Sequence, residues 1–363
     1  MRIALDVSAV PEQLTGAGRY VVELARRLPA SGHQLDLVAR RGDEARWREL
    51  DGAGVHGIVP RARGMRLLYE AWSLGLSAPA RAADVWHGPH YTMPRRGRTP
   101  TVVTIHDLTF FTHPEFHEPT KVAYFRRAIA YSATHARALI AVSHTTARLL
   151  DEHLAGHAPV VVAPHGVDVE HFSRLGDDER ILAAAGLDSQ TPYVLFVGTL
   201  EPRKGLDVLL RAFDLVTREL PELELWVAGR PGWGDVEVTG ARVRALGYVG
   251  EDLLVSLMRH ARAMAYPSRA EGFGLPVLEA LASGVPVVTT RGTVMEELSG
   301  GHAFLSDVGD VESLASAIVH ASSLDAAARV ARAAAGRAHA QSFTWEASVA
   351  RHLEAYELAR GQS

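Results

Sequence analysis

Short apolar segments alternate with helix-like segments along almost the whole chain, and this alternation constrains the fold more than any other feature. The apolar run 263–266, for example, is followed by two glycines, a helical segment over 276–283 and a second apolar run, 285–289. Pro276 suits the first turn of a helix, where a missing N–H costs nothing, and Gly284 suits a helix end. The repeat of strand, helix and strand predicts a parallel sheet with helices on both faces.

The alternation is interrupted once, which predicts two domains. Residues 164–168 break regular structure, a polar stretch with one short helical patch covers 174–189, and the alternation restarts at Tyr193. A chain of 363 residues is long enough for two domains of ordinary size. We therefore expect an α/β protein with two Rossmann-like domains, 1–175 and 176–363. Their ligands are expected in a cleft at the carboxyl ends of the strands.

The composition excludes several classes of function. The sequence has no cysteine, so it can form neither a disulfide nor a thiolate metal site. A net charge of −4 argues against a nucleic-acid-binding surface. No apolar run approaches the ~20 residues that a membrane helix needs, and the first apolar run has no charged leader before it. We expect a cytoplasmic protein that binds no nucleic acid.

The loop before the helix at 276–283 carries the clearest binding signal. The backbone N–H groups of residues 272–275 are expected to lie at the positive end of that helix, where a phosphate group fits. Glu271 precedes this turn, and Glu279 lies about one turn inside the helix. Because carboxylates repel phosphate but accept protons from hydroxyl groups, both are expected to face a polyhydroxylated group such as a ribose or a sugar. Two solvated glutamates on an ordinary strand–helix unit are the alternative.

A second turn, 198–205, follows the apolar run 193–197 and leads into a helix. Arg203 and Lys204 stand at the start of that helix, where a positive side chain opposes the helix dipole. A bound diphosphate would explain two cations in this position. A solvated Arg–Lys pair in a surface turn is the alternative.

The N-terminal half contains a glycine motif at 16–18. A loop is expected over 8–18 and a helix from about Arg19. The motif fails the nicotinamide dinucleotide fingerprint, because Val21 stands where a glycine is required and the preceding strand ends too early. Two interpretations remain: a backbone loop that contacts a phosphate or sugar, and a flexible turn.

His106 and Asp107 follow the apolar run 101–105 and are therefore expected at the cleft. They could orient a substrate hydroxyl, and an ordinary hydrogen-bonded His–Asp pair is the alternative. His87 and His90 lie nearby, but the intervening Gly-Pro gives neither helix nor strand geometry, so we predict no metal site.

The segment 61–81 mixes arginines with large apolar residues. It is expected to form a helix that packs on the N-terminal domain and turns its cations toward water or an acceptor. An amphipathic helix that touches a membrane surface is the alternative.

Taken in this order, the motifs resemble those of the retaining glycosyltransferases of family 4, which have the GT-B fold. The most specific part is 267–280, Pro-Ser-x-x-Glu-Gly-Phe-Gly-Leu-Pro-x-x-Glu-Ala, which is similar to the E-x7-E signature of that family. Segments 164–168, 201–205 and 343–345 are similar to other family segments. Residues 15–20, together with His106 and Asp107, resemble the mannosyltransferase-type branch.

The resemblance implies a role for each matching position. Glu279 would hold the nucleotide ribose, and Lys204, helped by Arg203, would neutralise the diphosphate. Glu271 would hold the donor sugar together with the turn that follows it: Gly272, Phe273, Gly274 and Leu275. Many relatives carry an arginine as a further phosphate ligand where this chain has Thr199.

The N-terminal domain is expected to supply the remaining contacts. Gly16 would approach the diphosphate, His106 would contact the transferring sugar, and Asp107 and Arg19 would contact the acceptor. The catalytic residues would be His106, Lys204 and Glu271. The last helix, about 345–360, is expected to return to the N-terminal domain.

The resemblance implies transfer of a hexose from a nucleotide diphosphate sugar to a hydroxyl group, with retention of configuration. No residue clearly provides a carboxylate nucleophile, so a front-face route without metal or other cofactor is favoured. GDP-mannose is the first expectation, and a UDP- or dTDP-sugar of a natural-product or polysaccharide pathway is the alternative. The acceptor could be a glycan, a glycolipid or a small molecule, and the enzyme could lie at the inner membrane face. A sugar-nucleotide epimerase or phosphorylase and a non-catalytic sugar-nucleotide sensor are the rival classes.

Overall fold

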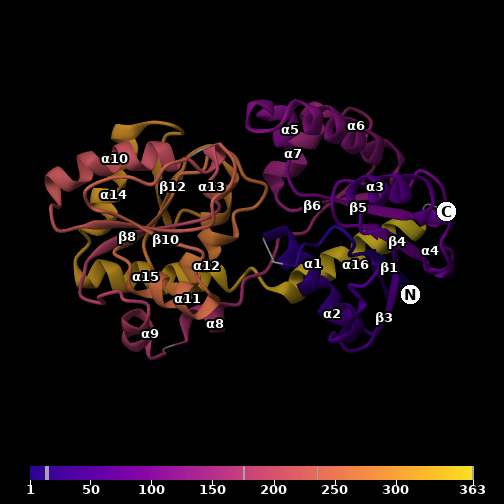
Figure 1. Cartoon of the computed structure of the whole chain (residues 1–363), viewed down its shortest axis with the longest axis horizontal. Helices are drawn as coiled ribbons and strands as arrows, with labels where there is room; N and C mark the ends of the chain where they lie inside the picture. Colours follow the sequence, from indigo (N-terminus) through magenta and orange to yellow (C-terminus); the bar gives the residue numbers. More distant parts are fainter. Residues whose placement is uncertain (13–15, 175, 235, 362–363) are drawn as a thin grey trace. The chain divides into compact units, whose positions relative to one another are not determined.

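A computed structural model describes residues 1–12, 16–174, 176–234 and 236–361 (Figure 1). The chain forms two compact units: Met1–Gly166 with Trp345–Ser363, and Val167–Thr344. The predicted domain boundary, between residues 175 and 176, therefore lies inside the second unit. Each unit is a parallel β-sheet covered by helices, so the predicted α/β class with two Rossmann-like domains is confirmed.

The sheet of the first unit has seven parallel strands in the order β3-β2-β1-β4-β5-β6-β7. Its direction of winding reverses between β1 and β4, because β2 and β3 extend the sheet on one side and β5 to β7 on the other. The strands are β1 (Arg2–Asp6), β2 (Gln34–Arg40), β3 (Ala53–Val59), β4 (Val85–Gly88), β5 (Thr101–Ile105), β6 (Ala138–Ala141) and β7 (Val160–Val162).

Helices cover both faces of this sheet because alternate residues of each strand are apolar on both sides. In β5, Val102 packs in the core formed with α1 and α16, whereas Val103 packs in the core formed with α6 and α7. The helices are α1 (Gly16–Arg27), α2 (Glu44–Arg48), α3 (Arg63–Trp72), α4 (Ala78–Ala82), α5 (Thr109–Thr112), α6 (Pro119–His135), α7 (His144–His153) and α16 (Trp345–Gly361), with short 3₁₀ turns η1 (Pro29–Ser31), η2 (Leu74–Leu76) and η3 (Pro114–Phe116).

Two expectations for this unit are wrong in detail. Helix α1 begins at Gly16 and not near Arg19, so the glycine motif forms the first turn of a helix and not a loop. Burial of Tyr20, Val21 and Leu24 in the core outweighs the low helix propensity of the glycines. The segment 61–81 forms three short pieces, α3, η2 and α4, instead of one helix. Thr15, the first residue of the 15–20 motif, lies outside the described residues.

The sheet of the second unit has six parallel strands in the order β10-β9-β8-β11-β12-β13, and its winding reverses between β8 and β11. Helices α10 and α14 pack on one face through residues such as Phe196 of β8. The strands are β8 (Tyr193–Val197), β9 (Glu224–Ala228), β10 (Val243–Gly247), β11 (Ala263–Tyr266), β12 (Val287–Thr290) and β13 (Ala303–Ser306). The helices are α8 (Val169–Ser173), α9 (Asp178–Ala184), η4 (Pro202–Lys204), α10 (Leu206–Glu219), α11 (Glu251–His260), α12 (Leu275–Ser283), α13 (Val294–Ser299), α14 (Val311–Ser322) and α15 (Ala326–Ala340).

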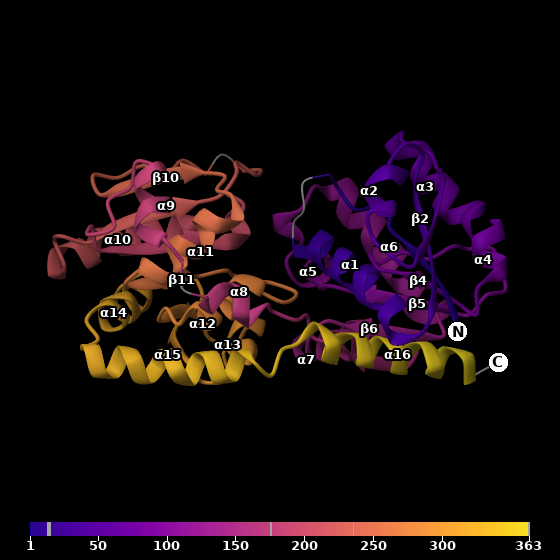
Figure 2. The same cartoon turned by 90° about the horizontal axis from the view of Figure 1, so that it is seen from below.

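Helix α16 packs in the first unit beside β6 and β7 (Figure 2). Its His352 is fully buried, with Nδ1 2.7 Å from the Ser348 carbonyl oxygen and Nε2 2.8 Å from the Tyr20 hydroxyl. Burial lowers the pKa of His352 to about 4, so the ring is neutral at pH 7. Because a carbonyl oxygen only accepts, Nδ1 carries the proton and Nε2 accepts from Tyr20.

The same donor–acceptor order continues across the sheet. The Tyr20 hydroxyl has donated its proton to His352, so it accepts from Thr104 Oγ1 at 2.9 Å. Thr104 in turn accepts from His87 Nε2 at 2.8 Å, and His87 Nδ1 accepts from the Tyr356 hydroxyl at 2.9 Å. One backbone carbonyl therefore fixes the direction of a hydrogen-bond chain that joins α1, β4 and β5 to α16.

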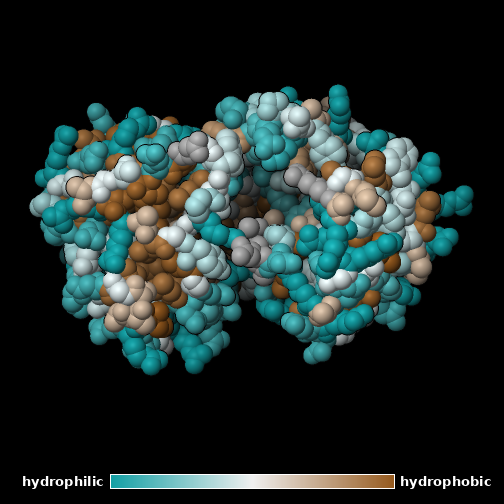
Figure 3. Space-filling view, viewed as in Figure 1, coloured by the Kyte–Doolittle hydropathy of each residue, from teal (hydrophilic) through white to brown (hydrophobic). Residues whose placement is uncertain are grey.

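Polar residues cover most of the visible face of both units in Figure 3, and hydrophobic residues show between them over β8 and β10. In the described part of the chain, no helix combines the length and the apolar character needed to cross a bilayer.

Candidate active site

A polar cluster of the second unit lies where the winding of its sheet reverses, the usual ligand position in open parallel sheets. Arg203 and Lys204 follow β8 in the turn η4, and Glu271 follows β11. Gly205, at the end of η4, has φ 71°, and a Cβ there would lie 2.2 Å from the Pro267 carbonyl oxygen. Only glycine therefore allows the two loops to approach this closely.

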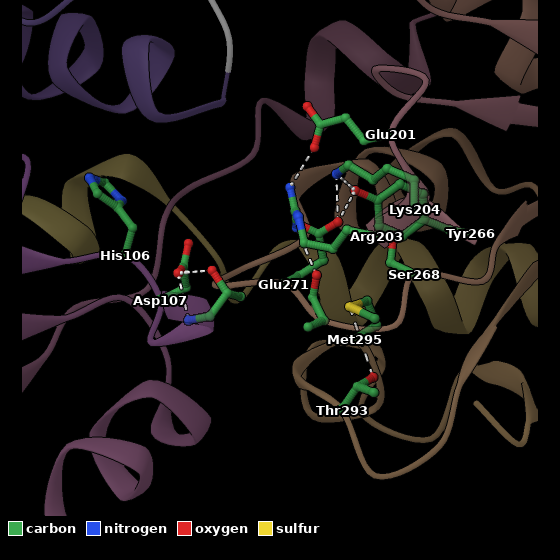
Figure 4. A network of polar contacts seen from close by, with 12 residues as sticks. His106, Asp107, Glu201, Arg203, Lys204, Tyr266, Ser268, Glu271, Thr293 and Met295 are labelled. Carbon is green, nitrogen blue, oxygen red and sulfur yellow. Dashed lines mark hydrogen bonds and ion pairs between the residues drawn. The ribbon is translucent and has the colours of Figure 1, made fainter. Parts of the chain in front are cut away.

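Glu271 joins the two cations in a compact network (Figure 4). Lys204 Nζ lies 2.5 Å from Glu271 Oε1 and 2.6 Å from the Tyr266 hydroxyl, which donates to the same Oε1 at 3.1 Å. Arg203 donates to Glu271 Oε2 at 2.6 Å and to the Ala270 carbonyl at 2.7 Å. Both carboxylate oxygens of Glu271 are thus held by cations.

The network is largely buried, and this sets the ionisation of its members. The side chain of Lys204 is 12% exposed and that of Glu271 is 9% exposed, so the expected alternative of solvated surface groups is wrong. Burial opposes ionisation of Glu271, but the charges and hydrogen bonds of Arg203 and Lys204 lower its pKa to about 2. Burial alone would lower the pKa of Lys204, whereas the Glu271 charge raises it above its ordinary value. Both groups are therefore charged at pH 7.

The turn after Glu271 leads directly into α12, as predicted. Gly274 has φ 102° and precedes the helix, which begins at Leu275 and ends before Gly284 at φ 82°. Glu279 lies within α12 and is only 6% exposed. The first turn of α12 and Glu279 are thus on the same short helix, and Glu271 lies four residues before that helix begins.

In the first unit, His106 and Asp107 do not form the hydrogen-bonded pair that was the alternative. His106 is buried, and its Nε2 donates to the Pro89 carbonyl at 2.7 Å. Burial lowers the pKa of His106, so the ring is neutral and Nδ1 is its acceptor atom. The Asp107 carboxylate accepts from the Thr109 N–H and hydroxyl, at 2.9 and 2.7 Å, and from the Tyr91 hydroxyl at 2.8 Å.

The first unit also contains a cavity that the sequence did not reveal, at the carboxyl ends of β1 and β4 where that sheet reverses. Its volume is about 230 Å³. The lining combines polar, charged and aromatic residues: Asp6, Ala9, Arg66, Leu67, Glu70, Gly88, Pro89, His90, Tyr91, Thr92, Tyr124 and Phe125. Some of these residues lie in the segment 61–81 or in the stretch 87–90, but neither stretch was predicted to line a cavity.

The other predicted site residues are placed as follows. Gly16 is exposed at the first turn of α1, and Arg19 is half-buried in the same helix. Among the described residues, no group of three or more histidine or acidic side chains could hold a metal ion.

Comparison with known proteins matches both units to one enzyme family. Residues 14–171 match the model for "Glycosyltransferase Family 4", and residues 191–323 match that for "Glycosyl transferases group 1". O-antigen chain mannosyltransferase B from Escherichia coli is 30% identical over 384 residues, covering 99% of this chain and 100% of that protein.

Of two further similarities, one covers a smaller share of this chain and the other has a lower identity. D-inositol 3-phosphate glycosyltransferase from Mycolicibacterium vanbaalenii is 33% identical over 246 residues, which cover 61% of this chain and 53% of that enzyme. Among solved structures, sucrose-phosphate synthase from Thermosynechococcus elongatus superposes with a TM-score of 0.78 at 20% identity, covering 100% of both chains.

Proposed function

Because the chain belongs to glycosyltransferase family 4, we propose that it transfers a mannosyl residue from GDP-mannose to a saccharide hydroxyl with retention of configuration. It is a glycosyltransferase of the GT-B fold that takes its sugar from a nucleotide sugar. The similarity over the full length to an O-antigen chain mannosyltransferase is the observation that carries the choice of mannose and of a polysaccharide acceptor.

The donor is proposed to bind at the network of Arg203, Lys204 and Glu271. Within the described residues, Lys204 uses two of its three N–H groups, on Tyr266 and Glu271, which leaves one for a phosphate oxygen. The first turn of α12 offers further donors to the diphosphate, and Glu279 accepts from the ribose hydroxyls. Arg203 adds the positive charge that Thr199 does not supply. These contacts need no metal ion.

The geometry of Glu271 favours a front-face reaction over double displacement. Double displacement requires a carboxylate that is free to attack the anomeric carbon. Both oxygens of Glu271 already accept hydrogen bonds from cations, and its pKa is lowered to about 2 by the same groups. We therefore assign Glu271 to holding the donor sugar. The oxygen of the leaving phosphate takes the proton of the acceptor hydroxyl. Lys204 and the N-terminus of α12 stabilise the negative charge of that phosphate. The neutral His106 accepts a hydrogen bond from a sugar hydroxyl at Nδ1.

A donor panel tests this proposal. GDP-mannose, UDP-glucose, UDP-galactose and dTDP-glucose are each incubated with the enzyme, with and without a mixture of methyl glycosides, in EDTA. We expect GDP to be released from GDP-mannose only when an acceptor is present, and no nucleotide to be released from the other donors. The product should be α-linked, as determined by NMR of the anomeric proton. Release of UDP or dTDP instead would identify the alternative donors. An epimerised donor, consumption of inorganic phosphate, or the absence of release from every donor would identify the rival classes.

We also propose that the first unit touches an anionic membrane surface through α3 and η2. Four large apolar side chains, spaced three and four residues apart, are exposed there: Met65 (61%), Leu68 (65%), Trp72 (47%) and Leu76 (46%). Arg96 lies 5.1 Å above the Trp72 ring, and Arg61 is 69% exposed nearby along the chain. Exposed apolar residues flanked by arginines suit the headgroup region of a membrane.

Co-sedimentation with lipid vesicles tests this contact. The protein should sediment with vesicles that contain phosphatidylglycerol and much less with pure phosphatidylcholine vesicles. Leu68→Glu should weaken binding about tenfold, because one buried leucine contributes about 1.5–3 kcal/mol. Val330→Glu is the matched control, since Val330 is 70% exposed on α15 of the other unit. Equal binding by both variants would contradict the assignment to α3.

A further inference from the structure

We propose that the cavity between β1, β4, α3 and α6 holds an uncharged pyranose ring of the acceptor, and that it discriminates against phosphorylated acceptors. This inference rests on the proposed function, because it names the substrate class of the second substrate. The cavity lies in the first unit alone, at the point where its sheet reverses. About 230 Å³ is less than the volume of sites for drug-sized ligands and suits one sugar ring.

Two carboxyl groups form the polar wall of the cavity. Asp6 ends β1, and Glu70 on α3 is 8% exposed. Ser8 bridges them, because its backbone N–H donates to Asp6 at 2.9 Å and its hydroxyl donates to Glu70 at 3.2 Å. Burial and the neighbouring Asp6 raise the pKa of Glu70 to about 7. Near neutral pH the pair therefore presents both proton acceptors and a proton, which matches the hydroxyl groups of a sugar.

The charge inside the cavity excludes a phosphate. Arg66 is the only arginine or lysine among the described lining residues, and its guanidinium lies 3.2 Å from Glu70. Burial lowers the pKa of His90 to about 3, so this ring adds no positive charge at pH 7. With Asp6 and Glu70 opposing one arginine, the cavity is neutral to negative. A phosphate dianion would enter without a free counter-ion.

The cavity also has an aromatic wall. Tyr91, Tyr124 and Phe125 line it, and the Tyr91 and Phe125 ring centroids are 5.7 Å apart. Such rings pack against the C–H faces of a pyranose, while the hydroxyl groups reach the polar wall. Buried His90 Nε2 has no hydrogen-bond partner within the described part of the chain, so it can serve one of these hydroxyls.

The loop after β4 is held in a strained shape that places this wall. Tyr91 has φ 64° and is the single non-glycine residue with positive φ in the described chain. A Cβ at Gly88 would lie 2.2 Å from the Thr92 carbonyl oxygen, so the loop closes tightly on itself. The Tyr91 hydroxyl is fixed at 2.8 Å from Asp107. Backbone strain at a residue that lines a cavity is typical of a binding site.

Binding of acceptor analogues without any donor tests the proposal. Saturation-transfer NMR is measured for methyl α-mannoside, methyl α-glucoside and methyl N-acetylglucosaminide, and for mannose 6-phosphate and glucose 6-phosphate, with the full-length protein. At least one neutral glycoside should bind, and the phosphates should bind at least about tenfold more weakly. Tyr124→Ala should weaken the neutral glycoside at least about fivefold. Tyr131→Ala, on the same helix but outside the cavity, is the control.

Glu70→Gln tests the charge argument separately. Because it frees Arg66 from its counter-ion, it should raise phosphate binding relative to neutral glycoside binding about tenfold. GDP binding, measured by calorimetry, should be the same in wild type, Tyr124→Ala and Glu70→Gln, which shows that both variants are folded. Equal binding of neutral and phosphorylated sugars, or no effect of Tyr124→Ala, would overturn the proposal. The donor panel does not depend on these results, so failure of one proposal is distinct from failure of the other.

Discussion

Replacing Lys204 with alanine is expected to lower kcat about 10²–10³-fold, the cost of removing one group that stabilises a developing charge. Lys204 is buried, its pKa is raised by Glu271, and it is therefore positively charged throughout the working pH range. Its remaining N–H group is proposed to donate to the phosphate that leaves. Because this interaction strengthens as the glycosidic bond breaks, the donor KM should change much less than kcat.

The chain offers a matched control, since Lys121 and Lys204 are its only lysines. Lys121 lies on α6 and pairs with Glu118 at an exposed position, so Lys121→Ala should keep full activity. Glu279→Gln should have the opposite signature, a raised donor KM with little loss of kcat, because the ribose does not react. If the Lys204→Ala enzyme kept a kcat within threefold of the wild-type value, Lys204 would not be a catalytic residue.

Local signals in the sequence were sufficient to predict the helices and strands around the proposed donor site. Pro276 and Gly284 mark both ends of α12 to within one residue, because each has a strong preference for its position. The start of α1 was missed because Gly16 and Gly18 were assigned to the loop predicted over 8–18, although the core residues after them decide where the helix begins. The edge strand β10 was missed because its residues are half-buried or exposed, so it lacks an apolar run.

The contacts within the sites depend on strand order, which the sequence does not encode locally. Arg203 and Glu271 were both predicted as site residues, but their pairing follows from the adjacency of β8 and β11. Tyr266 was interpreted as part of an apolar strand, yet its hydroxyl completes the network. Asp6 and Glu70 are 64 positions apart, and although Glu70 lies in the segment 61–81, no sequence pattern links the two residues, so their shared cavity could only be found in the folded chain.

The buried histidines should make the first unit unstable in mild acid. Burial lowers the pKa of each of five rings: His87, His90, His106, His165 and His352. In the unfolded chain these groups titrate near their ordinary value of 6.5, whereas His352 in the folded chain titrates near 4. Above pH 6.5 both states are neutral, and stability does not depend on them. Below pH 6.5 the unfolded chain takes up protons that the folded chain cannot, so the free energy of unfolding falls.

The size of the loss can be stated for His352. The difference between 6.5 and about 4 corresponds to about 3 kcal/mol once the pH is below 4. At pH 5 only the difference between 6.5 and the pH contributes, and it corresponds to a loss of about 2 kcal/mol in the free energy of unfolding for this one residue. Glu70 acts in the opposite direction, because its raised pKa of about 7 lets the folded chain hold a proton between pH 4.5 and 7. Burial also raises the pKa of Asp6, which acts in the same direction as Glu70, but two carboxyl groups do not compensate five histidines.

Urea unfolding at pH 7.5 and pH 5.0, followed by circular dichroism, measures this loss. His352→Gln is the informative variant, because the glutamine amide can donate to the Ser348 carbonyl and accept from Tyr20 without titrating. It should lose about 2 kcal/mol less than wild type between the two pH values, and only in the transition that includes α16. His135→Gln, at an exposed position on α6, should lose as much as wild type. Parallel losses in wild type and His352→Gln would mean that His352 is already protonated in the folded chain. The direction of the hydrogen-bond chain from Tyr356 to Ser348 would then be undetermined, because both ring nitrogens of His352 would donate.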